Sequence, residues 1–171
     1  MKTAGAVTRG NGPVNFSANV DTVNYCDGLL SIKFKPESET VTMGFATTNK
    51  SQKFIFSQKS TGYISFDKFM AANQKPGTYY WQITTSNYKK SGFYVLNLME
   101  KKQYAKNINA IVNNVMPIED KAELAFMTGF LLEQKKYLIE AQQYYEEAVR
   151  LNPKDKTYEA FNARFITNNQ L

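Results

Sequence analysis

Side chains able to do catalytic chemistry are scarce in this sequence. The chain of 171 residues contains no His and a single Cys, Cys26. Without His there is no His-based catalytic triad and no His-ligated metal site, and one Cys forms neither an intramolecular disulfide nor a multi-thiolate site. No Gly-rich phosphate loop or calcium-loop spacing is present. We therefore expect a protein that is not an enzyme and that holds no cofactor and no metal.

Carboxylates are the remaining source of acid–base chemistry. Between residues 1 and 97 they are Asp21, Asp27, Glu37, Glu39 and Asp67. A glycosidase uses two carboxylates that meet only in the folded chain, so the spacing leaves this alternative open without favouring it. Cys26 is interpreted as a small buried side chain or a loop thiol.

Positive charge is concentrated in the first part of the chain. The net charge is +6, and residues 1–100 hold 11 Lys and Arg against 6 Asp and Glu. A basic face able to contact an anionic surface, an anionic ligand or a glycan would comprise Lys33, Lys35, Lys50, Lys53, Lys89 and Lys90. Lysines on outward or edge strands are also an ordinary protection against aggregation, and this is the preferred interpretation. No specific contact with nucleic acid is predicted.

The elements that would position these side chains have two different periods. Up to about residue 97 apolar residues alternate with polar ones, as at Val41, Met43 and Phe45, and turn signals such as Pro76-Gly77 separate the runs. Alternation predicts strands with one buried face. The predicted strands are 14–20, 30–34, 41–45, 53–58, 62–66, 78–85 and 92–98, with one helical turn at 67–73. About seven short strands indicate a small antiparallel sandwich.

Beyond residue 97 the period becomes that of a helix. Tyr104, Ile108 and Ile111 share one helical face. Four helices are predicted: one after an Asn97–Glu100 capping box, one with Glu119 and Asp120 in its first turns, one over 138–151, and one ending near Asn168-Asn169. The predicted fold class is α+β with segregated parts, a sandwich domain at 1–97 and a helical domain at 98–171.

The helical part carries one pattern of small and aromatic residues, Gly129, Ala141, Tyr145, Ala148 and Pro153. Their spacing resembles the tetratricopeptide repeat (TPR), in which small residues let two antiparallel helices approach closely. Ala125 stands where that family has an aromatic residue. The resemblance covers about residues 122–155, one repeat, and one repeat cannot bury its own face. The helices before and after it must supply neighbours.

The resemblance to TPR proteins implies a partner surface. In that family the inner face of a repeat's first helix contacts the partner, and the last helix here offers two further aromatic residues. The implied partner-binding residues are Glu123, Phe126, Phe130, Glu133, Phe161 and Phe165. The preferred alternative for Phe126 and Phe130 is that they pack on the preceding helix or on the sandwich.

The run from Pro76 to Ile83 resembles the penultimate strand of fibronectin type III and immunoglobulin-like domains. The core would then contain Tyr79, Trp81 and Ile83. The resemblance also implies that the hydroxyl of Tyr79 forms a hydrogen bond back to the preceding turn. Trp81 is interpreted as core rather than as a sugar-binding platform. The antibody type is excluded, because no pair of Cys can join the sheets.

These features favour a non-catalytic protein–protein interaction or assembly module, whose partner is another protein or a second copy in a homo-oligomer. The resemblance implies a bacterial protein of the periplasm, cell surface or secreted class rather than the cytoplasm. The chain as given shows no signal peptide and no stretch long enough to cross a membrane. The alternative function is an anionic-ligand or glycan-binding module that uses the basic face of the sandwich.

Overall fold

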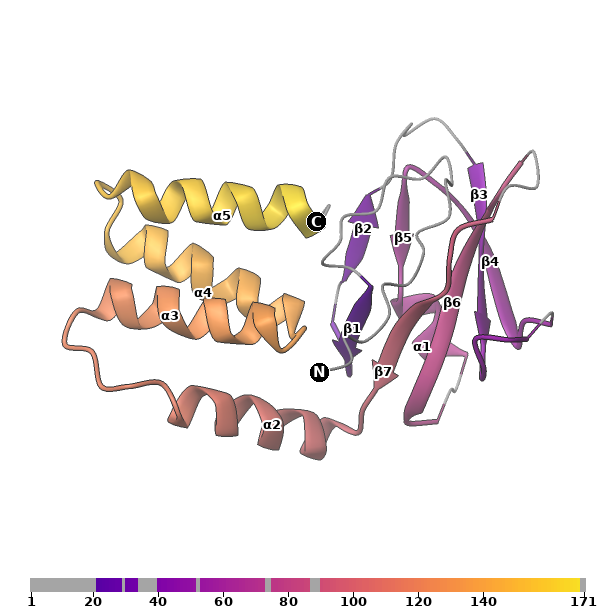
Figure 1. Cartoon of the computed structure of the whole chain (residues 1–171), viewed down its shortest axis with the longest axis horizontal. Coiled ribbons are helices and arrows are strands. Elements are labelled where there is room, and N and C mark those ends of the chain that lie inside the picture. The colour runs from indigo at the N-terminus through magenta and orange to yellow at the C-terminus, as the bar shows by residue number, and fades with distance from the viewer. Residues whose placement is uncertain are drawn as a thin grey trace, which may run out of the picture.

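A computed structural model gives the structure of the chain and describes residues 21–28, 30–33, 40–51, 53–72, 75–86 and 90–169. The described strands are β1 (Thr22–Tyr25), β2 (Ser31–Lys33), β3 (Thr40–Ala46), β4 (Phe56–Thr61), β5 (Tyr63–Ser65), β6 (Gly77–Thr85) and β7 (Tyr94–Leu98). The described helices are α1 (Asp67–Ala71), α2 (Lys101–Asn113), α3 (Lys121–Gln134), α4 (Leu138–Leu151) and α5 (Lys156–Asn169). The strands lie at one end and the four longer helices at the other (Figure 1). The strand predicted at 14–20 lies outside the described residues.

The main sheet is mixed and open. Its five strands have the order β1-β7-β6-β3-β4, and β2 pairs with β5 in a separate two-stranded sheet. β1 runs parallel to β7, with Thr22 opposite Val95, whereas the other neighbours in the main sheet are antiparallel. The prediction of a seven-stranded antiparallel sandwich followed by a helical part is therefore wrong.

Strand β6 shows what alternation predicts and what it does not. Tyr79, Trp81 and Ile83 are 8%, 0% and 0% exposed, as the period of two requires. The Tyr79 hydroxyl donates a hydrogen bond of 2.6 Å to the carbonyl of Lys75, in the preceding turn. Trp81 stacks on Tyr94 with ring centroids 4.5 Å apart, so it belongs to the core. Alternation identifies the buried face of a strand but not its neighbours, and the sandwich prediction fails at that point.

The strands and the long helices share one hydrophobic core. Its buried residues from the strands include Val23, Phe45 and Trp81, and those from the helices include Tyr104, Leu138 and Phe165. The helices are therefore not a separate layer that follows a sandwich. The predicted division at residues 97 and 98, which falls at the end of β7, stays a prediction.

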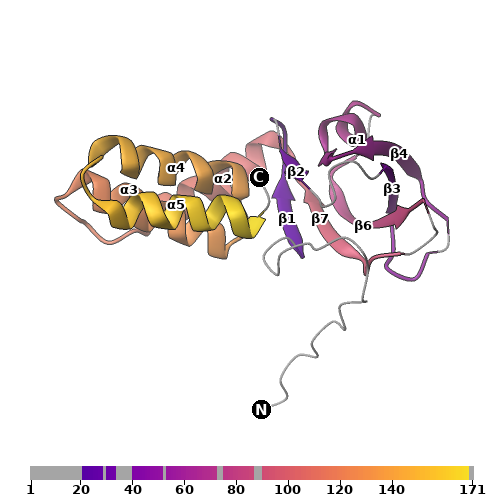
Figure 2. The ribbon, with the colours of Figure 1, turned by 90° about the horizontal axis from the view of Figure 1, so that it is seen from above.

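A chain of hydrogen bonds joins the sheet to the turn between α3 and α4. Thr78 Oγ1 donates to Asn97 Oδ1 at 3.1 Å, and Asn97 Nδ2 donates to Asn24 Oδ1 at 2.9 Å. Asn24 Nδ2 donates to the carbonyl of Lys135 at 2.7 Å, and its backbone N–H donates to that of Lys136 at 3.0 Å. The turn thus covers the outer edge of β1, the strand that lies nearest the helices together with β2 and β7 (Figure 2).

The helix boundaries follow local sequence signals. α4 spans the predicted residues 138–151. α3 begins after Asp120, whose carboxylate accepts hydrogen bonds from the backbone N–H groups of Ala122 and Glu123 at 2.8 and 2.9 Å. These bonds satisfy donors that the first turn of a helix leaves free.

The capping box predicted at Asn97–Glu100 is wrong. Asn97 lies in β7, and its side chain is engaged with Asn24 and Thr78 across the sheet. Glu100 is the residue before α2, and its side chain makes no capping hydrogen bond. Because the Asn97 side chain bonds to Asn24 and Thr78 in the sheet, it does not cap α2.

Candidate functional site

The pair of helices α3 and α4 is packed around Gly129. A Cβ atom at this position would lie 3.2 Å from the carbonyl oxygen of Ala141 and 3.2 Å from a ring carbon of Tyr145. Ala141, Tyr145 and Ala148 are all at most 1% exposed. The small side chains of Gly129 and Ala141 therefore allow α3 and α4 to approach closely, as their spacing in the sequence indicates. The resemblance to TPR proteins stays a prediction. Pro153 is exposed between α4 and α5.

Glu133, one of the predicted partner-binding residues, is engaged inside the helical part. The Tyr145 hydroxyl donates to Glu133 Oε2 at 2.6 Å, and Arg164 Nη2 lies 3.2 Å from the same oxygen. The side chain of Glu133 is 13% exposed. Burial, and then the hydrogen bond to Glu133, raise the pKa of Tyr145 above its ordinary value. Glu133 therefore holds α3, α4 and α5 together and is not free for a partner.

Three of the aromatic residues predicted to bind a partner pack inside the helical part instead, namely Phe126, Phe161 and Phe165. The rings of Phe126 and Phe161 meet edge to face with centroids 5.0 Å apart, and Tyr158 lies 5.4 Å from Phe126. Phe165 is 0% exposed and packs against Tyr145, so it cannot contact another chain. Helix α5, rather than the preceding helix or the sheet, is the neighbour that covers Phe126.

One side of α3 is covered only in part by α4 and α5, and α2 also contacts this helix. Glu123, Met127, Phe130 and Gln134 follow one another at intervals of four, three and four, so they share a helical face. This face, which we call the open face of α3, lies opposite the buried residues that pack on α4. Glu123 and Gln134 are exposed, Met127 is half-buried, and the half-buried Phe130 packs against the hydrophobic core. Sequence reasoning found Glu123 and Phe130 but missed Met127 and Gln134, although their spacing was the available signal.

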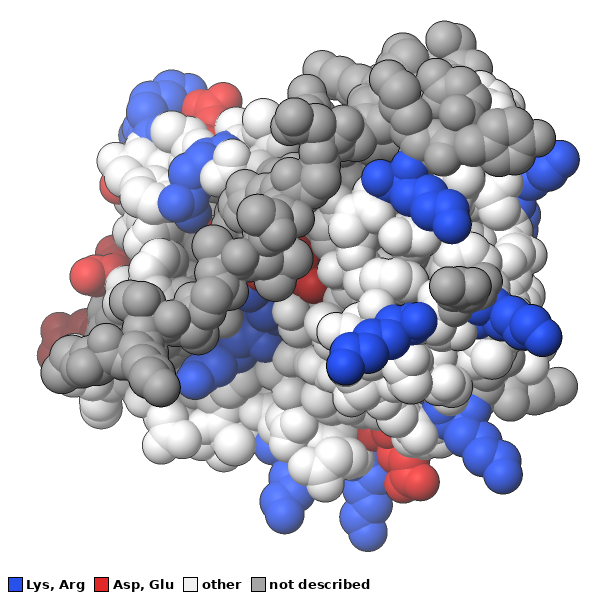
Figure 3. All heavy atoms as spheres, turned by 45° about the vertical axis from the view of Figure 1, so that its right-hand side comes forward, with Lys and Arg blue, Asp and Glu red and all other residues white. Residues whose placement is uncertain are grey.

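Lysines with few carboxylates among them lie at the strand end of the molecule. From residue 40 to residue 93 the sequence has seven Lys and one carboxylate, that of Asp67. Figure 3 shows Lys and Arg side chains spread over one side of the molecule, with few carboxylates among them. The described lysines in this range are exposed and have no ion pair with a described residue: Lys50, Lys53, Lys59, Lys68, Lys75 and Lys90.

The predicted basic face is described only in part. Lys35 and Lys89 lie outside the described residues, and only the backbone of Lys33, in β2, is described. Lys50 and Lys53 flank the turn before β4, and Lys90 forms an isolated bridge with Thr84 of β6. Lys59, Lys68 and Lys75 extend the basic surface beyond the predicted set. These three lysines were not predicted because each stands alone in the sequence, without a second Lys close by.

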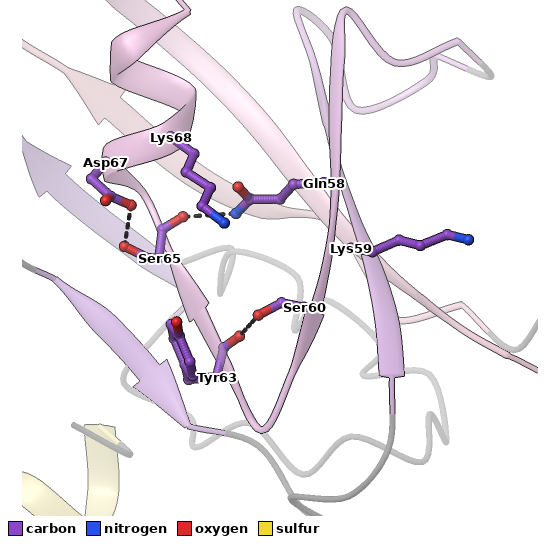
Figure 4. A pocket seen from close by; sticks show the side chains of 7 residues that line it. All are labelled: Gln58, Lys59, Ser60, Tyr63, Ser65, Asp67 and Lys68. Atoms are coloured by element: carbon purple, nitrogen blue, oxygen red, sulfur yellow. Dashed lines mark hydrogen bonds between the residues drawn. The ribbon is translucent and has the colours of Figure 1, made fainter.

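A pocket of about 310 Å³ lies at this end, between β4, β5 and α1. Its lining residues are Gln58, Lys59, Ser60, Tyr63, Ser65, Asp67 and Lys68. The Ser65 hydroxyl donates to Asp67 Oδ1, and this hydrogen bond is the main reason why the pKa of Asp67 lies below its ordinary value. In Figure 4 the side chain of Lys68 extends toward Gln58, whereas that of Lys59 points away on the other side of β4. The sequence did not predict this pocket.

The described residues offer no metal centre. Among them no group of three or more His, Cys, Asp or Glu side chains is placed to hold a metal ion. Cys26 is 5% exposed, and burial raises the pKa of its thiol, which lowers the share of reactive thiolate.

Within the described part of the chain, no helix combines the length and the apolar character that a membrane span requires.

Comparison with known proteins adds no family to this description. No protein-family model matches the chain, and no curated protein is significantly similar to it.

Proposed function

We propose that the chain is a non-catalytic assembly module, which pairs with a second copy of itself through the open face of α3. The observation that carries this proposal is the half-buried pair Met127 and Phe130. These side chains lie on the side of α3 opposite its fully buried residues, where Met127 keeps part of its surface in water and Phe130 also packs against the hydrophobic core. Apolar side chains left on an open helix face are stabilised when another surface removes them from water.

The open face of α3 is self-complementary. In an antiparallel pairing about a two-fold axis between Met127 and Phe130, Met127 of one copy meets Phe130 of the other. The same register sets the Glu123 carboxylate opposite the Gln134 amide of the second copy, which can donate a hydrogen bond to it. A two-fold contact uses the same patch on both subunits, so each pair occurs twice.

The test is the molar mass measured by light scattering from micromolar to millimolar concentration. We expect the mass to rise from that of one chain toward that of two. Met127→Glu places a charge in the contact and should keep the protein monomeric at every concentration. Met116→Glu is the matched control, because Met116 is 77% exposed in the loop before α3 and off the open face. A constant monomer mass for the unchanged protein, or equal effects of both substitutions, would contradict the proposal.

The lysine surface supports a second candidate function, binding of an anionic ligand or glycan. Seven lysines against one carboxylate over residues 40–93 give this end a positive field whatever its exact contacts. We expect retention on immobilised heparin that falls steeply with salt. Replacing Lys50, Lys53 and Lys59 together by Ala should release the protein at lower salt, whereas replacing Lys101, Lys102 and Lys106 of α2 should not. No retention at low salt would contradict this candidate.

A further inference from the structure

We infer that the pocket between β4, β5 and α1 is a binding site for one ring of an uncharged sugar. This inference is separate from binding of an anionic ligand by the lysine surface, because it names an uncharged ligand and the residues of the pocket. It does not depend on pairing through α3, which lies among the helices at the other end of the molecule (Figure 1).

The pocket exists because β4 and β5 are neighbours without being paired. The two strands meet at Gly62, whose φ of 80° allows the sharp turn, but they belong to different sheets. Side chains rather than a backbone ladder connect them. Gln58 Nε2 donates to the carbonyl of Ser65 at 2.7 Å, and the Ser60 hydroxyl donates to the carbonyl of Tyr63. The seam that this leaves is hollow and is closed at one end by α1 (Figure 4).

Donors and acceptors for hydroxyl groups lie next to one another in this seam. The exposed Asp67 carboxylate, whose pKa lies below its ordinary value, is bound by the Ser65 hydroxyl and by nearby backbone N–H groups, and its two oxygens have further acceptor positions. Lys68 supplies up to three donors. Hydroxyl groups both donate and accept hydrogen bonds, so a ring with adjacent hydroxyls can bind the Asp67 carboxylate and the Lys68 ammonium together.

The charge of the pocket favours an uncharged ligand over a phosphate. Asp67 and Lys68 bring one negative and one positive charge, and Lys59 points away from the pocket (Figure 4). A phosphate would have to approach the Asp67 carboxylate, which repels it. The lysines outside the pocket act at longer range, where salt screens them.

Tyr63 and the pocket volume set the size and shape of the ligand. Tyr63 is 51% exposed and lines the pocket, so part of its ring is accessible to the apolar face of a sugar ring. The volume of about 310 Å³ is at the lower limit of small-molecule pockets. It suits a single ring, with the rest of a longer glycan outside.

The test is a titration of the ¹⁵N-labelled full chain with methyl glucoside, methyl galactoside and N-acetylglucosamine, followed by NMR. We expect saturable shifts of the Tyr63, Ser65 and Lys68 amide signals with at least one sugar, at a Kd of about 1 mM, as befits a small ligand. Asp67→Asn should weaken binding at least tenfold, and Asp27→Asn, at an exposed carboxylate outside the pocket, should leave it unchanged. Tyr63→Leu should also weaken it, which provides a second variant if Asp67→Asn disturbs the fold.

Three outcomes would overturn the inference. They are no saturable shift with any of the three sugars, saturable shifts of these amides with inorganic phosphate instead of the sugars, and unchanged sugar binding in both pocket variants. The Met127→Glu protein should bind sugar as the unchanged chain does. Failure of pairing through α3 and failure of the sugar site are therefore seen in separate measurements.

Discussion

Replacing Tyr145 by Phe removes one hydroxyl from the centre of the helical part and leaves the packing intact. Tyr145 is 1% exposed, and its hydroxyl donates to Glu133 Oε2 at 2.6 Å. A hydrogen bond to a charged group contributes about 1.5–3 kcal/mol, and among the described residues the Glu133 carboxylate would keep Arg164 as its partner. We expect the free energy of unfolding at pH 7 to fall by about 2 kcal/mol, measured by urea denaturation.

The same substitution has a sign-specific dependence on pH. The folded protein holds the pKa of Tyr145 above the ordinary value of 10.0, because burial and Glu133 disfavour the phenolate. The stability from this group is therefore complete below pH 10 and is lost as the pH rises above it. The Phe variant lacks this loss. The difference in free energy of unfolding between the unchanged protein and Tyr145→Phe should therefore narrow above pH 10, by up to about 1.4 kcal/mol per pH unit.

Tyr144→Phe is the matched control, because the described structure gives the half-buried Tyr144 no hydrogen bond through its hydroxyl. We expect it to change the free energy of unfolding by less than about 0.5 kcal/mol. Equal effects of both substitutions at pH 7 would contradict a stabilising role for the Tyr145–Glu133 hydrogen bond. A difference in unfolding free energy between the unchanged protein and Tyr145→Phe that stays constant or widens from pH 9 to pH 11 would contradict the raised pKa of Tyr145.

Three further substitutions test other parts of the structure by urea unfolding. Asn24→Ala removes the bonds to Asn97 and to the Lys135 carbonyl and should cost about 2 kcal/mol, whereas an equal stability would show that the junction does not depend on them. Gly129→Val forces a branched side chain between α3 and α4 and should cost about 3 kcal/mol or more. Tyr25→Phe should weaken the loss of stability between pH 10 and 12, since burial above all raises the pKa of Tyr25 to about 12 in the folded state.

Properties encoded within a short segment were predictable from the sequence. The alternation in β6 predicted the burial of Tyr79, Trp81 and Ile83, because side-chain direction in a strand depends on position alone. The bounds of α4 followed from its apolar face and from Asn152-Pro153 after it. Gly129 and Ala141 indicated a close approach of two helices, since only small side chains permit it.

Properties that depend on distant segments were not predictable in the same way. The parallel pairing of β1 with β7 joins residues more than 70 positions apart, and no local period encodes it. Asn97 has the residue type of a helix cap, but Asn24 and Thr78 take its side chain in the sheet. The pocket depends on β4 and β5 lying side by side without pairing, which a description of single strands does not contain.

The covered edge of β1 limits how copies of this protein can join through their sheets. Growth of a continuous sheet from molecule to molecule needs two free edges on each copy. In this sheet the outer N–H of Asn24 is already bound by the Lys136 carbonyl, whereas β4, the last strand of the order, has no described strand beyond it. Pairing between the main sheets of two copies can therefore occur at β4 but cannot continue from β1. Such pairing gives a dimer and not a fibre.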